Sequence, residues 1–240
     1  MLSHENIKLS LGNAEGIVSV GEAKSRLGWY QVTLIFFLWS ILGLVIEELW
    51  MRVSMGVVQS RAGLVWGPFS PLYGTGAVLL TAVLLRLHDL RATAWQIFLA
   101  CMLLGGVLEQ ATGWAMENFF GIVSWDYIAG HVPCALSKWV ALPFLFAWGG
   151  LGLLWDRMVM PGLMPVLGGP TTKTRVVFVA LIGLFLVLDI VVTIVCFDRM
   201  AERDANIPPS NAIEEWVDKS YNDDFVARRF QNIEDVTNRG

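Results

Sequence analysis

The stretch WQIFLACMLLGGVLEQATGWAMENFFG, residues 95–121, decides the fold. It is long and apolar enough to cross a bilayer as one helix, yet it contains two carboxylates, Glu109 and Glu117. At about 100° per residue, Gly106, Glu109, Gly113 and Glu117 share one face of that helix. An acid at the centre of a membrane helix costs at least ~2.5 kcal/mol, so such a face normally points toward protein or a water-filled cavity. The stretch therefore predicts a membrane helix with an acidic inner face.

The composition of the whole chain supports a membrane protein. Of the 240 residues, 55% are hydrophobic and 16% are charged, whereas an ordinary soluble domain has about 25% charged residues. Lys and Arg form no basic block, so we expect no nucleic-acid partner. Cys101, Cys134 and Cys196 are far apart and lack metal-ligand spacing. We expect free thiols, and neither a metal nor another cofactor.

Hydropathy divides the chain into an N-terminal arm (1–27), a transmembrane domain (28–200) and an acidic soluble tail (201–240). The predicted fold is all-α, a polytopic transmembrane bundle with irregular Gly/Pro connectors and about five spans, at residues 29–55, 68–87, 95–121, 138–155 and 176–197.

The tail and the loop charges give two further expectations. The segment IEEWVDKSY, which begins at Ile213, predicts a short amphipathic helix, and a second helix is expected to start near Asn222. The distribution of Lys and Arg favours a cytoplasmic N-terminus, with the C-terminus and both Gly/Pro connectors on the outer side. Localisation in the cell membrane as a multi-pass protein follows.

The first span repeats the pattern of the central one, because Ser40, Gly43 and Glu47 share a face. One interpretation is that Glu47, Glu109 and Glu117 line a polar site for a cation, a proton or a polar substrate. The alternative is that they pair with other groups and only fix helix packing. Glu47 and Glu117 lie near span ends, so simple exposure at the membrane interface is a third possibility.

Three residues of the connectors join the candidates. Arg61 follows the first span and either pairs with a glutamate or contacts lipid head groups. Tyr73 lies in the breaker-rich run 67–76, which either holds an anionic group or forms a tight start to a span. Asp126 lies between Trp125 and Tyr127, where it either faces a pore mouth or caps a turn.

Asp189 stands in the middle of the last span and needs a partner there. That partner is expected on another helix of this chain or on a second subunit, so a homo-oligomer through the Asp189 face is one expectation.

Sequence motifs exclude one source of energy. GGPTTKT at residues 168–174 resembles a phosphate-binding loop but lacks its Gly-Lys-Ser/Thr ending and a preceding strand. The chain is therefore not expected to hydrolyse ATP by that route. It also contains no His-Glu-x-x-His motif and no serine-nucleophile elbow.

The order of motifs over residues 32–155 resembles the putative ABC-transporter type IV family of small bacterial membrane proteins. The matching features are Gly43 with Glu47, Arg61-Ala62-Gly63, Gly67-Pro68, Pro71-Leu72-Tyr73-Gly74, Glu109 with Glu117, and Phe120-Gly121 followed by Trp125-Asp126-Tyr127. One departure is that residues 131–137, HVPCALS, lack the arginine of the family pattern. If that arginine balances a family glutamate, the charge pairing here must differ.

The resemblance implies a transport permease, and power from ATP would need a separate ATP-binding subunit. Two other functions remain open. One is a membrane-embedded enzyme in which Glu109, Glu117 or Asp126 acts as acid or base on a lipid-like substrate. The other is a scaffold or regulator that acts through the tail, for which no catalytic activity is expected.

Overall fold

The computed structural model describes residues 27–166 and 172–235 of the chain. Its helices are α2 (Trp29–Met55), α3 (Pro71–Asp89), α4 (Ala94–Phe120), α5 (Leu142–Leu154), α6 (Met160–Val166), α7 (Lys173–Asp204), α8 (Ala212–Ser220) and α9 (Asp223–Arg229). A π-helical turn, η1 (Trp155–Val159), joins α5 to α6, and two short strands, β1 (Ile122–Val123) and β2 (Glu234–Asp235), pair antiparallel. The predicted all-α fold is confirmed.

The bounds of the long helices follow from their end residues. Thr93 caps α4 by accepting a hydrogen bond from the N–H of Gln96, whose side chain in turn accepts from the N–H of Thr93. Gly56 and Gly121 end α2 and α4 at φ of +67° and +65°, in the left-handed region that favours glycine. Pro71 opens α3 in its first turn, where its missing N–H is not needed.

Four helices are long and apolar enough to cross a membrane, namely α2, α3, α4 and α7. The span expected at 138–155 begins later, at Leu142, and α5 itself has only 13 residues. It continues without a break through η1 and α6 to Val166. About five crossing segments therefore agree with the sequence prediction, although α3 starts three residues later than expected and α7 extends further at both ends.

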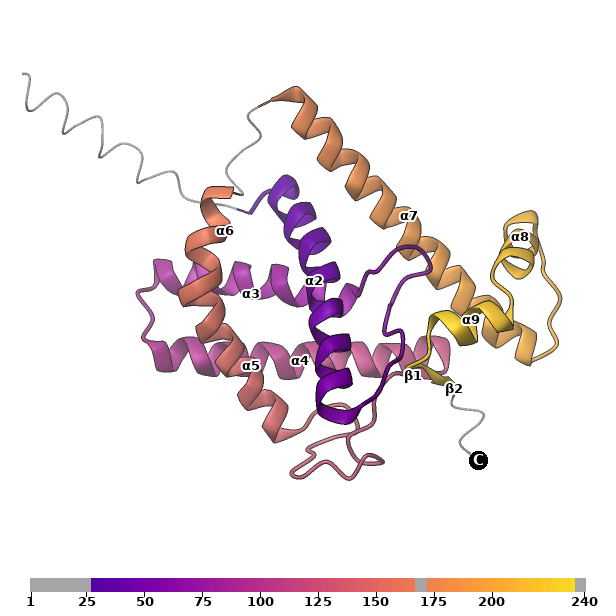
Figure 1. The fold of residues 1–240 in the computed structure, drawn as a ribbon, viewed down its shortest axis with the longest axis horizontal. Coiled ribbons are helices and arrows are strands. Elements are labelled where there is room, and N and C mark those ends of the chain that lie inside the picture. The colour runs from indigo at the N-terminus through magenta and orange to yellow at the C-terminus, as the bar shows by residue number, and fades with distance from the viewer. Residues whose placement is uncertain (1–26, 167–171, 236–240) are drawn as a thin grey trace, which may run out of the picture.

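Small residues let the helices approach closely. Figure 1 shows α3 and α4 side by side, with α2 and the α5–α6 segment running across them. A Cβ added to Gly105 would lie 2.0 Å from the ring of Trp148, and one added to Gly152 would lie 2.4 Å from Cys101. Glycine at these two positions is required by packing between α4 and α5, as is common where membrane helices meet.

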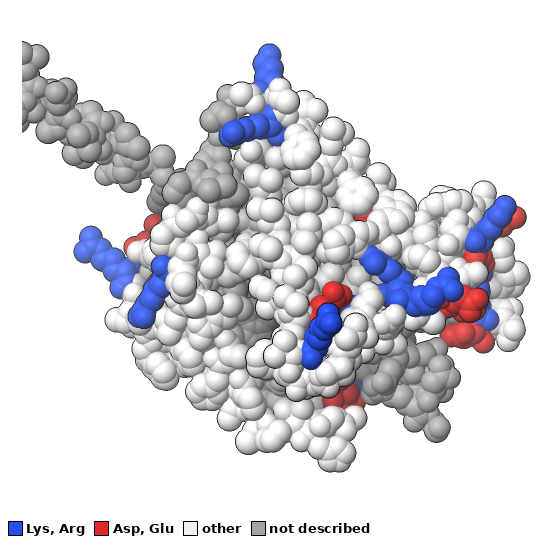
Figure 2. All heavy atoms as spheres, in the orientation of Figure 1, with Lys and Arg blue, Asp and Glu red and all other residues white. Residues whose placement is uncertain are grey.

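The outer surface of the helices is apolar. On α7, large side chains that include Leu181, Leu184, Val187 and Leu188 are exposed. Figure 2 shows that charged side chains are sparse over the helices on that face and gather over the tail and at helix ends. Such a surface suits contact with lipid rather than with water.

The tail folds back onto the bundle. It contains the two short helices that the sequence predicts, α8 and α9, capped by Asn211 and Asn222. Ser60 and Ser124, on the two connectors, hydrogen-bond Gln231 and Asn232 of the tail. Both connectors and the tail therefore lie at one end of the molecule. The expected arm over residues 1–27 falls, apart from Leu27, outside the described residues, as do residues 168–171 of the GGPTTKT run.

Candidate functional site

Glu109 is the most buried of the three candidate glutamates in the helical bundle. It lies midway along α4, and the residue is 8% exposed. Its Oε1 accepts a hydrogen bond of 3.0 Å from the indole Nε1–H of Trp148 on α5. Its Oε2 has no hydrogen-bond partner among the described residues, although the phenol of Tyr127 lies close to the carboxylate. No ion pair found in the described ranges includes Glu109.

Glu47 has the opposite surroundings. It stands near the end of α2, where the connector that follows folds inward and places Arg61 against it in an ion pair through Nε. The backbone N–H of Arg61 also donates to Oε1 of Glu48, at 3.1 Å. Arg61 therefore pairs with a glutamate, which is the first of its two interpretations.

Tyr73 contacts the same acid from the first turn of α3. Its side chain packs across Gly43 of α2, where an added Cβ would lie 2.4 Å from the Cβ of Tyr73. The phenol reaches the carboxylate of Glu47. Gly43 therefore leaves room for the ring of Tyr73, and Glu47, one helical turn later, lies within reach of its phenol.

Tyr127 lies near both glutamates, and sequence reasoning did not select it. Burial raises the pKa of Tyr127, and the nearby carboxylates of Glu109 and Glu47 raise it further, so the phenol stays protonated and able to donate. Its backbone N–H donates to the carbonyl of Lys138, and its ring stacks on Phe144 with centroids 4.7 Å apart. The sequence feature that could have identified it is the run Trp125-Asp126-Tyr127, in which the tyrosine rather than the aspartate lies beside Glu109 and Glu47.

The remaining two candidates lie outside this cluster. Asp126 accepts hydrogen bonds at Oδ1 from the N–H groups of Ile128 and Ala129, which is the turn-capping alternative. Glu117 forms an ion pair of 2.6 Å with Lys138 from the connector between β1 and α5. The cation that this connector brings to α4 therefore neutralises Glu117 and leaves Glu109 without one.

Asp189 has a hydrogen-bond partner within the same chain. It is fully buried, and its Oδ1 accepts a hydrogen bond of 2.9 Å from the backbone N–H of Trp66. One turn away, Thr193 accepts another from the N–H of Val65. The partner of Asp189 is thus the first connector of the same chain, because α7 packs directly against it. A homo-oligomer through the Asp189 face is not supported.

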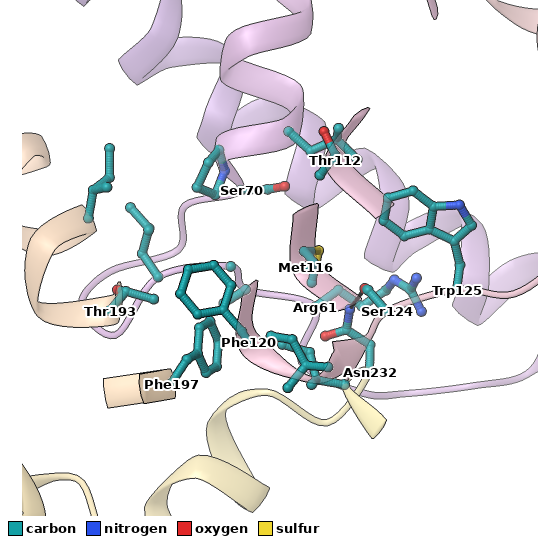
Figure 3. Close-up of a pocket in the computed structure, with 18 of the residues that line it drawn as sticks. Arg61, Ser70, Thr112, Met116, Phe120, Ser124, Trp125, Thr193, Phe197 and Asn232 are labelled. Carbon is teal, nitrogen blue, oxygen red and sulfur yellow. Dashed lines mark hydrogen bonds between the residues drawn. The ribbon is translucent and has the colours of Figure 1, made fainter. Parts of the chain in front are cut away.

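Two cavities meet at Glu47. Figure 3 shows the first, of about 280 Å³, which lies between α4, α7, both connectors and the tail. Its labelled wall residues include Arg61, Thr112, Phe120, Phe197 and Asn232. The second, of about 270 Å³, lies between α2, α3, α5 and η1. Glu47 lines both, so the ion pair with Arg61 stands between them.

The described residues contain no group of three or more His, Cys, Asp and Glu side chains able to hold a metal ion. The cluster instead combines acids with neutral aromatic donors, which hold a carboxylate in place while leaving its charge largely unbalanced. Such an arrangement can take up a proton or a cation.

Comparison with protein families yields one match. A family model described as putative ABC-transporter type IV matches residues 34–194, from the first turns of α2 to the middle of α7. No curated protein matches the chain, and no solved structure does. The matched range includes every residue of the cluster around Glu47 and Glu109 but stops before the tail.

Proposed function

Because this chain belongs to the putative ABC-transporter type IV family, we propose that it is a transport subunit whose Glu109 binds a proton or a cation at an acid-lined site between helices. The site comprises Glu47, Arg61, Tyr73 and Glu109, to which we add Tyr127. Glu117 and Asp126 lie at its edge and position the connector. The family and the apolar helices support a multi-pass membrane protein, and we place it in the cell membrane with a cytoplasmic N-terminus.

The observation that carries the proposal is the contrast among three glutamates. Glu47 and Glu117 each have a cationic partner, whereas Glu109 is the most buried of the three and has only neutral donors. A buried carboxylate without a cation is costly, so it is stable only after binding a proton or a positive ion. Exchange between these two states is the elementary step of a coupled transport site.

Infrared spectroscopy of the purified protein in lipid nanodiscs tests this role directly. In buffer without added monovalent cation, we expect a carbonyl band from a protonated carboxylic acid at neutral pH, and we expect added cation to weaken it. Glu109→Gln should remove the part of the band that responds to cation, while Glu117→Gln, the matched control on the same helix, should keep it. Identical spectra for wild type and Glu109→Gln, with and without cation, would contradict the proposal.

A source of energy is a separate part of the proposal. The chain lacks a complete phosphate-binding motif, so transport driven by ATP requires a second, ATP-binding subunit. Purification from native membranes in mild detergent after chemical cross-linking should recover that subunit. If cross-linked material contains no ATP-binding protein, the ATP-driven part is wrong, while the role of Glu109 is unaffected.

A further inference from the structure

The cavity between α2, α3, α5 and η1 has an unusual wall. Five aromatic side chains line its space of about 270 Å³, together with one carboxylate; they are Trp39, Trp50, Tyr73, Trp148, Trp155 and Glu47. Aromatic rings attract cations through the negative face of the ring, and tryptophan does so best. A cavity with several aromatic rings and an acid in its wall is an arrangement that recognises organic cations.

The polar edges of two of these rings are already engaged. The indole N–H of Trp155 donates to Oγ1 of Thr81 at 3.1 Å, and that of Trp148 donates to Glu109 at 3.0 Å. Trp39 packs on Trp155 with ring centroids 4.3 Å apart. Because these N–H groups are hydrogen-bonded to protein, Trp148 and Trp155 present ring carbon atoms to the cavity rather than hydrogen-bond donors. The wall therefore suits a ligand that carries charge but needs few hydrogen bonds.

The charges around the cavity favour a positive ligand. Glu47 lies in the wall, and Glu109 lies directly behind Trp148. The guanidinium that pairs with Glu47, that of Arg61, is not among the residues that line this cavity, so the charged group in the wall is the Glu47 carboxylate. An anion would meet this carboxylate, and a small, strongly hydrated cation would lose its water to an apolar wall. A cation whose charge is spread over alkyl groups avoids both penalties.

The cavity also has a route for such a ligand. Trp50 and Ile46, on the last turns of α2, line it and are 66% and 59% exposed. The opening therefore faces the apolar surface of the bundle, through which an amphiphilic cation can arrive from the membrane.

We propose that this aromatic cavity binds a hydrophobic organic cation of the quaternary ammonium class, and that such cations are the substrate class of the transport site. The second half rests on the proposed function, because it assumes that Glu109 and the cavity serve one transport event. Binding itself requires only the cavity. Its volume is slightly below the ~300–1,000 Å³ of pockets for drug-sized ligands, so it suits a small cation such as benzyltrimethylammonium.

The test measures binding of radiolabelled benzyltrimethylammonium to the full chain in nanodiscs, with empty nanodiscs subtracted. Neopentylbenzene, which has the same shape without the charge, serves as the competitor. We expect saturable binding that excess unlabelled cation displaces and the neutral analogue does not. Equal displacement by the two compounds would show a cavity for any apolar molecule and would overturn the proposal, as would the absence of saturable binding.

Variants locate the binding. Trp50→Leu, at the exposed rim, leaves the packing intact and should weaken binding about fivefold, the effect of one partly solvated cation–π contact. Glu47→Gln should weaken it about tenfold or more, because it leaves Arg61 without its acid beside the cavity. Trp95→Leu, an exposed tryptophan at the start of α4, is the control and should bind like wild type.

Unchanged binding in both Trp50→Leu and Glu47→Gln would place the ligand elsewhere and overturn the proposal. This outcome is distinguishable from failure of the proposed function, because the infrared band of Glu109 is measured without any organic cation.

Discussion

Among the described residues, two regions that bury charge compensate that charge in different ways. Where α7 meets the tail, the side chain of Arg199 is 1% exposed and bonds Asp218 and Glu202, with Glu214 at 3.8 Å. In the helical bundle, Glu109 is nearly as buried but receives only the indole N–H of Trp148 and the nearby phenol of Tyr127. The first region contains acids in excess around a cation, and the second contains an acid without a cation.

The difference separates a structural charge from a chemical one. Removing one member of a compensated cluster takes a partner from each of the others, so the cluster holds the tail in place. Neutralising an uncompensated acid removes the free-energy cost of burying an unpaired charge and breaks no ion pair. We therefore explain such an acid by what it binds. Substitutions in the two regions should therefore change stability in opposite directions.

The largest effect on stability is expected from Arg199→Met. It removes the shared partner of three carboxylates and should destabilise the docked tail by about 2 kcal/mol, between the values for surface and buried ion pairs, because the carboxylates remain 20–33% exposed. Limited proteolysis in detergent should cut the tail faster in this variant. Arg228→Met, at an exposed position of α9, is the control and should behave like wild type.

Acid should release the tail as well, with a slightly smaller effect. Hydrogen bonds from Arg199 and Arg203 hold the pKa of the Asp218 carboxyl below its ordinary value of 3.8. A lowered pKa in the folded state means that the stabilisation is complete above pH 3.8 and is lost as the pH falls through the lower, folded value. The arginines stay charged throughout.

Proteolysis of the tail measured against pH checks this expectation. Asp218→Asn should show accelerated cleavage at neutral pH and a smaller further increase on acidification. Glu202, Glu214 and Asp223 also contact these arginines, so some pH dependence should remain. A pH profile in Asp218→Asn that matches wild type would remove Asp218 from the mechanism.

The sequence predicts the helices that carry these charged residues better than it predicts the contacts between them. Hydropathy places the first span at 29–55, the bounds that α2 has, because that signal is local. Burial of Glu109 was also predictable from its place on a helix face shared with Gly113. The two aromatic groups beside Glu109 come from positions 18 and 39 residues later, Tyr127 on a connector and Trp148 on α5, and no local pattern encodes that folding brings them to it.

Asp189 shows the same limit. Its need for a partner followed from its depth in a span, but the partner is a backbone N–H of the connector, at Trp66. Every residue type has that group, so composition and spacing carry no signal for it. The tail was likewise predicted as two helices, while its docking through Arg199 depends on three acids brought together by folding.

Trp148→Phe should have a smaller effect that sharpens the role of Glu109. Phenylalanine keeps the ring against Gly105 but removes the hydrogen bond to Oε1, which should cost about 1 kcal/mol if the acid then lacks its donor. Thermal unfolding in detergent gives the change in stability. In the Glu109→Gln background, the same substitution should have a different effect, because the amide can reorient and is uncharged. Additive effects of the two substitutions would argue against the contact.

Glu117→Gln should have the smallest effect. The pair of Glu117 with Lys138 has both side chains about a quarter exposed, so its loss should change stability by about 0.5 kcal/mol or less. Glu109→Gln, two helical turns away, should leave the protein as stable as wild type or more so, because it removes an uncompensated buried acid. Thermal unfolding of the two variants side by side tests this ordering. If Glu109→Gln destabilises the protein more than Glu117→Gln does, Glu109 is a packing residue like any other, and the distinction between the two regions fails at its most informative position.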